Sequence, residues 1–500
     1  MGKVNTSLVV GLTFVATLGG LLFGYDTAVI SGAVSSIDAY FINPLGLSEG
    51  WRSSLSGWTI SSALVGCIIG AFLAGWVSTS LGRKGGLITS ALLFLLGSIG
   101  SAVPELGFGP IGHMGPSALW PFIFYRILGG VGVGMASMLS PLYIAEISPS
   151  AIRGRLVSFN QLAIVGGMLI VYFVNWYIAG QGDDGWLKST GWRLMLASEA
   201  VPSLIFLTLL LFVPDTPRWF VMRGQSDRAL AELRRVTDEA DARSIVAEIE
   251  RTLVVRTMPL FSFGTAIVIA GVLLSIFQQF VGINAVLYYA PKMFENMGAS
   301  TDSALLQTVI VGAANTLFTI IAILTVDKLG RKPLLIAGGL IMAVSMFALG
   351  CLFYANADMS NKGLSEASLV AAVAYIAGFA LSWGPVVWVV LSEMFPNSIK
   401  GKAMAIAVAA QWGANLLVSW SFKVLIENSA LTALFHHGFP YWIYGAMSLL
   451  AAFFVLRFVP ETKGRTLESM QELWSPGGAQ PVPAAAASPL QDVAVAGKLK

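Results

Sequence analysis

Leu81-Gly82-Arg83-Lys84 recurs later in the chain as Leu329-Gly330-Arg331-Lys332. Each copy lies between two apolar stretches that are long enough to cross a lipid bilayer. Three further matches occur in the same order at an offset of about 247 residues: 145–155 with 392–402, 213–216 with 459–462, and Gln161 with Gln411. Chance rarely gives four ordered matches at one offset, so we interpret the chain as a duplicated unit. Repeated halves are typical of membrane transporters.

Composition indicates a membrane protein. Of the 500 residues, 56% are hydrophobic and 11% are charged, whereas a soluble domain carries about 25% charged residues. Apolar runs such as 7–22, 194–213 and 443–459 approach the roughly 20 residues that a bilayer-spanning helix needs. We therefore predict an all-α membrane protein. The net charge of +3 gives no indication of nucleic-acid binding.

Two features of the chain exclude other classes. Cys67 and Cys351 lie inside apolar runs, so we interpret them as small hydrophobic residues and predict neither a disulfide nor a metal site. The first apolar run follows a single Lys and has no clear cleavage site, which favours a retained first span over a signal peptide.

Hydropathy predicts twelve transmembrane helices. Their approximate positions are 8–34, 57–79, 86–104, 121–143, 155–179, 192–213, 261–291, 305–326, 332–355, 368–394, 401–423 and 439–459. Short basic links follow spans two, four, eight and ten. Basic links remain in the cytoplasm, so we expect both termini to be cytoplasmic.

The duplication predicts four segments: a six-helix half at 1–213, a linker at 214–260, a second six-helix half at 261–474 and a tail at 475–500. The linker holds eight Arg and eight Asp or Glu, with apolar residues at helical spacing. We expect short amphipathic helices with a solvated charged face there. The tail is rich in Pro, Ala and Gly, which predicts disorder.

Three ionisable residues are predicted at bilayer depth, where charge is expensive and therefore marks a candidate functional site. Asp26 lies late in span one, Arg126 about five residues into span four, and Glu199 about seven residues into span six. An ionised Asp26 would bond to Arg126, and a protonated one would release it and bias the conformation. A static ion pair between spans one and four is the alternative.

Neutral polar residues form a second candidate set. Span seven contains Gln278, Gln279 and Asn284, and a helix break near Gly282 and Pro291 would let Gln279 and Asn284 converge. Other spans contribute Gln161, Asn315, Trp383-Gly384-Pro385, Trp388, Gln411, Trp412 and Asn415, with Phe23 and Tyr288 beside them. Interhelical hydrogen bonding would explain any single amide. Taken together, donors, acceptors and aromatic faces suit a neutral polyol.

At this point the sequence resembles the sugar porter family of the major facilitator superfamily. The resemblance rests on both Gly-Arg-Lys motifs and on Arg126 with Gly129-Gly130, Pro214-Asp215-Thr216-Pro217-Arg218, Gln278 to Tyr289, and Pro460-Glu461-Thr462-Lys463-Gly464. It extends from Gly19 to about Trp474 and is strongest with the bacterial D-xylose–proton symporters. It implies the major facilitator fold, in which two six-helix halves are related by internal duplication.

The resemblance also implies residue roles. A sugar pocket would use Gln161, Gln278, Gln279, Asn284, Trp388 and Gln411, surrounded by Phe23, Tyr288, Asn315, Gly384 and Trp412. Asp26 would couple transport to a proton with Arg126 as its partner. A cytoplasmic charge network that latches the halves in one state would comprise Arg83, Glu146, Arg153, Asp215, Arg218, Arg331, Glu393 and Lys400. Considered alone, these charges would be weak surface pairs.

Three positions depart from the family pattern. Thr79-Ser80 replaces an acidic residue of the first loop motif, and Lys400 replaces the usual Arg, which loses bidentate geometry. Met168 occupies a pocket position where the xylose symporters have Gln. An apolar, flexible side chain there leaves another pentose or a hexose open as the substrate.

The sequence therefore predicts a secondary active transporter of the bacterial inner membrane. It would import a monosaccharide, D-xylose in first place, with a proton by alternating access, as a monomer in the lipid bilayer and without a cofactor or metal. The alternatives are an uncoupled facilitator, a sugar-sensing receptor and a membrane enzyme. No metal motif, nucleophile elbow or phosphate loop favours the enzyme.

Overall fold

The computed structural model describes residues 5–111, 113–149, 152–253, 258–356 and 361–463. Within these residues every regular element is a helix, and twelve helical segments are long and apolar enough to cross a membrane. The predicted fold class and number of spans are confirmed. The tail predicted to be disordered lies outside the described residues.

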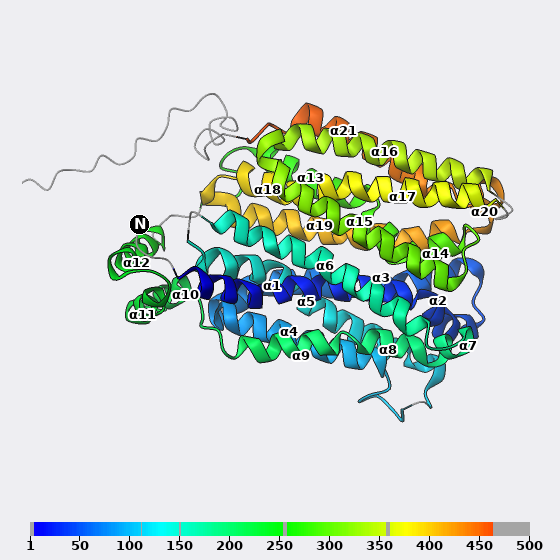
Figure 1. Cartoon of the computed structure of the whole chain (residues 1–500), viewed down its shortest axis with the longest axis horizontal. Helices are drawn as coiled ribbons and strands as arrows, with labels where there is room; N and C mark the ends of the chain where they lie inside the picture. Colours follow the sequence, from blue (N-terminus) through cyan, green and yellow to red (C-terminus); the bar gives the residue numbers. More distant parts are fainter. Residues whose placement is uncertain (1–4, 112, 150–151, 254–257, 357–360, 464–500) are drawn as a thin grey trace, which may run out of the picture.

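The first half contains six spans (Figure 1). They are built from α1 (Thr6–Val29), α3 (Glu49–Ser80), α4 (Gly82–Ala102), α5 (Leu119–Ile147), α6 (Arg153–Ala179), and α8 (Trp192–Ala197) with α9 (Ala200–Leu210). Short helices α2 (Val34–Ile37) and α7 (Asp184–Trp186) lie at one end. Within this half α5 packs against α3 and α4, and α1 packs against α5 and α6.

The second half repeats this arrangement. Its spans are built from α13 (Thr265–Phe280) with α14 (Ile283–Glu295), α15 (Thr301–Leu329), α16 (Arg331–Ala355), α17 (Lys362–Leu381) with α18 (Trp383–Met394), α19 (Asn397–Ile426) and α21 (Phe439–Phe458). The short helix α20 (Ser429–Phe435) precedes the last span. The halves meet where α3 packs on α19 and α6 packs on α15.

Several helices start earlier than the hydropathy predicted. The second span begins at Glu49 instead of 57, and the sixth begins at Asp184 instead of 192. Hydropathy marks only the apolar part of a helix, whereas the polar first turns continue the same hydrogen-bonded coil. Boundaries predicted from apolar runs are therefore too short at these ends.

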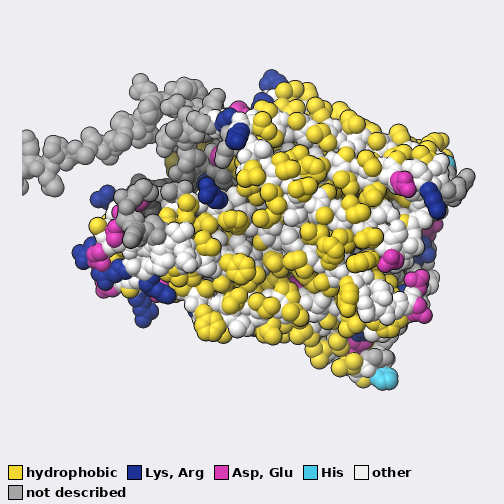
Figure 2. All heavy atoms as spheres, in the orientation of Figure 1, with side chains coloured by type: hydrophobic (Ala, Val, Ile, Leu, Met, Phe, Trp, Pro, Cys, Tyr) yellow, Lys and Arg dark blue, Asp and Glu magenta, His cyan; other side chains and the backbone are white. Residues whose placement is uncertain are grey.

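The outer surface explains how the bundle remains in lipid. Large apolar side chains such as Phe14, Trp76, Leu324 and Val344 are exposed. Figure 2 shows hydrophobic side chains covering the middle of one face, with charged side chains gathered towards both ends of the molecule. A helix satisfies its own backbone hydrogen bonds, so such a surface is stable in a bilayer.

Two spans are interrupted where the sequence predicted breaks. Gly282 separates α13 from α14 with a φ of 93°, a left-handed conformation that glycine adopts without steric cost. Ser382 separates α17 from α18 with φ −136° and ψ −83°. Irregular backbone at this depth is tolerated where it is buried in protein or lines a cavity, and both Gln278 and Ser382 are buried.

The expectation that Pro291 would help to interrupt span seven is wrong. Pro291 lies inside α14, and the helix continues past it. Proline frees the carbonyl four residues earlier, which belongs to Leu287. The Tyr172 hydroxyl donates to this carbonyl at 3.1 Å, so the lost helical bond is replaced from the other half.

Span six contains a break that the sequence analysis missed. Ser198 and Glu199 form a turn between α8 and α9. Pro202 cannot donate to the carbonyl of Ser198, and the amide of Val201 donates to that carbonyl instead at 3.3 Å. Glu199 is therefore at a helix junction rather than in a regular turn.

The linker forms the expected amphipathic helices, which are α10 (Pro217–Met222), α11 (Ser226–Val236) and α12 (Glu239–Leu253). Their apolar faces share a small core of Val221, Ala229, Leu233, Ala242 and Val246. These helices define the linker end of the bundle, and α2, α7 and α20 lie at the opposite, far end (Figure 1).

The two ends differ in how the halves are joined. Among the described residues, polar contacts between the halves lie in the middle and towards the far end: Met168 with Asn315, Val165 with Thr316, Tyr172 with Leu287, Trp176 with Asp302, Ser54 with Trp420, Asp38 with Lys423, Ser35 with Glu295 and Glu49 with Ser429. Within the same part of the chain, polar contacts at the linker end stay in one half or connect it to the linker.

Candidate functional site

An ion pair lies inside the first half. Arg126 Nη1 on α5 donates to Asp26 Oδ1 on α1 at 2.9 Å, and both residues are at most 3% exposed. Gly129, one turn after Arg126, packs beside the carboxylate, since a Cβ there would lie in ordinary van der Waals contact with Asp26 Oδ1, at 3.6 Å. Within the described residues Asp26 Oδ2 has no hydrogen-bond partner. One oxygen is therefore held by the guanidinium, and a proton bound by this carboxyl group or by Glu199, which lies within hydrogen-bonding reach of Asp26, could be shared by the two acids.

Glu199 belongs to the same cluster. It is 2% exposed and lies close enough to interact electrostatically with Asp26 and Arg126. The neighbouring Ser198 Oγ and Tyr25 hydroxyl are 2.8 Å apart. Two acids beside one guanidinium leave one negative charge in excess when both are ionised, so binding of one proton would neutralise the cluster.

A small cavity connects this cluster to the second half. Its volume is about 10 Å³, and it is lined by Arg126, Thr27 and Cys67 from the first half and by Tyr288 on α14. Tyr288 also interacts with Asn415 on α19. Arg126 of the ion pair and Tyr288, which is predicted to lie beside the sugar, therefore line the same cavity.

The amides of span seven converge as predicted. Asn284 Nδ2 donates to Gln279 Oε1 at 2.6 Å across the Gly282 break. Gln278 Nε2 donates to the carbonyls of Trp383 and Gly384, at 2.8 and 3.3 Å, across the second break. The two helix breaks are therefore tied to each other, and all three amides are fixed in place.

Two further contacts join predicted pocket residues of the two halves. The Phe23 and Trp412 rings have centroids 5.6 Å apart. Asn315 Nδ2 lies 3.9 Å from Met168 Sδ and is 4% exposed. A thioether is only a weak acceptor, so Asn315 retains donor capacity for another polar group.

Other predicted pocket residues are present without mutual contacts. Trp388 is half-buried on α18, and Gln161 is half-buried on α6 and makes no hydrogen bond within the described residues. Gln411 is 7% exposed, and its Oε1 has no partner in that same part of the chain. Unpaired amides in a membrane protein are typical of a site that meets a polar ligand or water.

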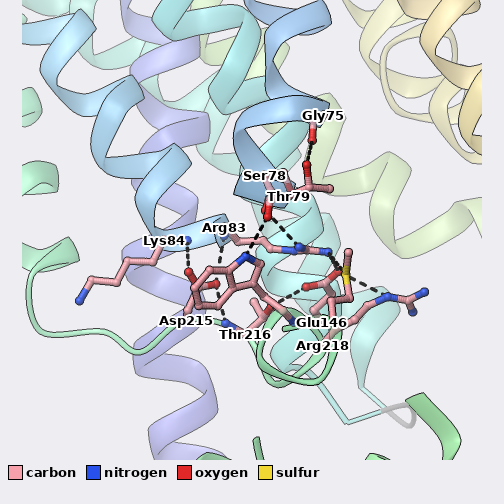
Figure 3. A network of polar contacts seen from close by, with 11 residues as sticks. Gly75, Ser78, Thr79, Arg83, Lys84, Glu146, Asp215, Thr216 and Arg218 are labelled. Carbon is pink, nitrogen blue, oxygen red and sulfur yellow. Dashed lines mark hydrogen bonds and ion pairs between the residues drawn. The ribbon is translucent and has the colours of Figure 1, made fainter. Parts of the chain in front are cut away.

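At the linker end the first half builds a compact network, which Figure 3 shows in detail. Arg83 Nη2 pairs with Glu146 Oε1 at 2.8 Å, and Arg218 Nε lies 4.0 Å from the same oxygen. Thr216 Oγ1 donates to Glu146 Oε2 at 2.6 Å. Trp219 Nε1 donates to the Thr79 carbonyl at 3.3 Å, at the position where the family's acidic residue is missing.

Asp215 caps the start of α4. Its carboxylate accepts the backbone amides of Arg83 and Lys84 at 3.0 and 3.3 Å. Burial nevertheless raises the pKa of Asp215, against the lowering effect of hydrogen bonds from Thr216, Arg83 and Lys84. The residue therefore secures a helix start in addition to carrying charge.

The second half repeats the network. Arg331 Nη2 pairs with Glu393 Oε1 at 2.9 Å, and Thr462 Oγ1 donates to Glu393 Oε2 at 2.5 Å. Glu461 accepts the backbone amides of Arg331 and Lys332 at 3.1 and 3.0 Å. The duplicated motifs therefore have the same structural role in both copies.

Arg153 and Lys400 stand apart from these networks. Arg153 Nη2 donates to the carbonyl of Ser148 at 3.4 Å, and Lys400 interacts with Glu393 only at a distance. Neither forms an ion pair within the described residues. No group of three metal-ligating side chains is found in the described part of the chain either.

The sequence analysis missed several residues. Glu461 and Thr462 belong to the second network, and their match to Asp215 and Thr216 was the available signal. The charged triad of the buried Lys423 with the partly exposed Asp38 and Glu427 at the far end was also missed. Only the four-residue spacing of Lys423 and Glu427 hinted at it, because Asp38 is 385 residues away in the chain.

Comparisons with known proteins agree with this architecture. The profile of the family described as sugar (and other) transporter matches residues 12–474. The D-xylose-proton symporter of Escherichia coli (strain K12) is 54% identical over 483 residues, which cover 95% of this chain and 97% of the relative. The glucose facilitated diffusion protein of Zymomonas mobilis is 47% identical over 474 residues, which cover 94% of this chain and 98% of that relative.

A solved structure of the xylose transporter XylE from E. coli, in an inward open conformation, also matches. Its TM-score is 0.83 at 51% sequence identity, and the match covers 93% of this chain and 100% of that chain. The similarity therefore includes nearly all of the described helices.

Proposed function

This chain belongs to the sugar porter family of the major facilitator superfamily, and we propose that it imports a monosaccharide, D-xylose in first place, together with a proton. The membrane enzyme is excluded, because the family consists of transporters. The 54% identity to a D-xylose-proton symporter supports the choice of sugar and of coupling ion.

The observation that carries proton coupling is the buried pair of Asp26 and Arg126, with its one unpartnered carboxylate oxygen. While ionised, Asp26 holds α1 against α5 through a charge-assisted bond. A proton on Oδ2 removes that charge and leaves the two helices free to separate. The proton thereby shifts the balance between conformations, as coupling requires.

The sugar is proposed to bind among the amides of α13 and α14. Gln278, Gln279 and Asn284 offer several donors and acceptors without charge, while Phe23, Trp388 and Trp412 offer apolar ring faces. The remaining proposed contacts are Gln161, Tyr288, Asn315, Gly384, Gln411 and Met168. Because the site lies where two helices break, binding there would shift the short helices α14 and α18 that follow the breaks.

We place the linker end in the cytoplasm, in agreement with the basic links, and both termini with it. The far end then faces outwards in a bacterial inner membrane. The contacts between the halves gather towards the far end, which corresponds to an inward-facing state. The two halves, 1–213 and 261–474, would rock against each other around the site, with the linker 214–260 connecting them in one monomer.

The linker-end networks would act in the opposite state. In the inward-facing state their ion pairs remain within each half. When the linker end closes, Arg153 and Lys400, which lack ion pairs here, would become available to acidic residues of the other half.

An uncoupled facilitator is the second candidate. The 47% identity to a glucose facilitated diffusion protein favours it, because a relative that close has a name without a coupling ion. The ion pair of Asp26 with Arg126 favours the symporter.

A pH measurement separates the two candidates. Cells that express the protein are de-energised in a weak buffer, and the external pH is recorded after D-xylose is added. Symport predicts alkalinisation that is absent with Asp26→Asn. Sugar entry without a pH change in either strain would establish the facilitator, and a response only to another sugar would change the substrate.

A further inference from the structure

A cluster of three charged residues around the buried Lys423 lies at the far end, outside the proposed sugar and proton sites. Lys423 Nζ lies 2.7 Å from Asp38 Oδ2 and 2.7 Å from Glu427 Oε1, and its side chain is 1% exposed. Asp38 and Glu427 are 17% and 24% exposed. We refer to Asp38, Lys423 and Glu427 as the far-end triad.

The triad joins the two halves. Asp38 begins the π-helical turn Asp38–Ile42 after the first span, whereas Lys423 and Glu427 are at the end of α19. Rocking of the halves would separate these elements whenever the far end opens. The Asp38–Lys423 bond therefore cannot persist through a transport cycle, unlike an ion pair within one half.

Each partner of this bond has a second partner in its own half. Lys423 keeps Glu427, which is one turn further along the same helix and moves with it. Asp38 Oδ1 accepts a hydrogen bond from Ser56 on α3. Leaving a buried charge unpaired costs far more than exchanging its partner, so these second partners make the bond strong yet reversible.

Neighbouring contacts also join α3 of the first half to α19 of the second half. Trp420 Nε1, one turn before Lys423, donates to the Ser54 carbonyl of α3 at 3.2 Å. The Trp420 carbonyl is so close to α3 that a Cβ at Gly57 would lie 2.7 Å from it. The triad therefore sits on a tightly packed seam between α3 and α19.

We propose that the Asp38–Lys423 bond is a reversible latch that holds the far end closed, with Glu427 and Ser56 as holding partners when it opens. The latch rests on the proposed alternating access but on neither the sugar nor the proton. Its strength sets how often the far end opens to admit substrate.

Pulsed electron paramagnetic resonance tests the latch without transport. Spin labels are attached at Leu47→Cys and Leu434→Cys, which are exposed at the far end on opposite halves, in a Cys67→Ala, Cys351→Ala chain. Asp38→Asn is expected to raise the ratio of long to short label distances about tenfold, within the range of typical coupling between sites. Lys423→Met should shift it in the same direction.

Glu427→Gln is the matched control, because it removes a carboxylate of the triad that lies on the same helix as Lys423. It should leave the distance ratio unchanged or lower it, because Lys423 keeps Asp38 while the far end is closed and loses its own-half partner when the far end opens.

Unchanged distances in Asp38→Asn would refute the latch, and so would equal opening in Glu427→Gln, since the triad would then only stabilise the fold. If Lys423→Met fails to insert, Asp38→Asn still decides, because it leaves Lys423 paired. A failed latch with sugar-induced alkalinisation intact would leave the proposed function standing.

Discussion

In the first half, Asp215 accepts the backbone amides of Arg83 and Lys84, and in the second half Glu461 accepts those of Arg331 and Lys332. The Arg83 side chain pairs with Glu146, which also accepts a hydrogen bond from Thr216. In the same way the Arg331 side chain pairs with Glu393, which also accepts one from Thr462. The duplicated unit has thus kept its linker-end chemistry in both copies.

The polar residues buried between the two ends of the bundle show the opposite. The first half buries Asp26, Arg126 and Glu199 there, and the second half places Gln278 and Gln279 around its helix breaks. Residues that cap helices must be retained wherever the fold repeats, whereas residues that line the site are free to diverge, and of these only the pair Gln161 and Gln411 was among the repeat matches. We therefore propose that the first half supplies the proton site and that the second half supplies the amides at the helix breaks, to which Phe23, Gln161 and Met168 of the first half are added.

The largest effect is expected from Asp26→Asn. A potential of 100 mV is worth about 2.3 kcal/mol per charge, which supports about 50-fold accumulation of a sugar that enters with one proton. The variant should accumulate none, yet it should exchange labelled for unlabelled sugar in proteoliposomes. Asp227→Asn, on the exposed surface of α11, should behave as the parent. Loss of exchange in Asp26→Asn would mean that Asp26 is needed for sugar binding or for the conformational change itself, and not for coupling alone.

Gln279→Ala should weaken sugar binding and leave the coupling to the proton intact, which is the reverse of the result expected for Asp26→Asn. The change removes an amide and leaves Asn284 without its partner, so the Kd for sugar should rise about 10- to 100-fold, as unpaired buried polar groups cost about 1–3 kcal/mol. Isothermal titration calorimetry measures this. The control is Gln307→Ala, whose amide bonds within its own helix to Ser303. A normal Kd with lost coupling would reverse the assignment of the halves.

Met168→Gln should have a smaller effect, on specificity. Met168 is the first-half residue that faces Asn315 of the second half, and an amide there adds a donor and an acceptor. We expect the preference for D-xylose over D-glucose to change by up to about tenfold, from competition in counterflow, because one hydrogen bond is worth about 1 kcal/mol. Met168→Leu keeps the apolar character and should leave the preference unchanged.

The smallest expected effect is on the pH dependence of stability, through Asp215 and Glu461, the carboxylates that accept the first backbone amides of α4 and α16. Burial raises the pKa of Asp215. Glu461 is less buried, and although burial acts to raise its pKa, hydrogen bonds from the amides of Lys463, Arg331, Lys332 and Thr462 lower it overall. A lowered pKa gives stability that is present above the unfolded value near 4.3 and is lost as the pH falls. A raised pKa gives the opposite trend, since the folded state then binds the proton more tightly.

Thermal unfolding in detergent between pH 7 and pH 3 should show this difference. The stability advantage of the parent over Glu461→Gln should shrink with falling pH, while its advantage over Asp215→Asn should grow. We expect shifts of less than about 3 °C. Parallel trends in the two variants would show that the two caps are equivalent.

Much of the fold was predictable from local patterns. Apolar runs gave the twelve spans, the repeated motifs gave the two halves, and Gly282 marked the break in span seven. Pairing of Asp26 with Arg126 was also predictable, because a charge buried in lipid requires a partner. These features depend on composition and short spacing, which a sequence displays directly.

Contacts between distant segments required the tertiary structure. The Tyr172 hydroxyl that supports α14 beside Pro291, and the bond from Asp38 to Lys423, join residues more than a hundred positions apart. The sequence by itself determined the spans, the duplication and the candidate polar residues, because hydropathy and helix capping are local. Only the tertiary structure decided which end of the bundle is closed, because that depends on how two separately folded halves pack against each other.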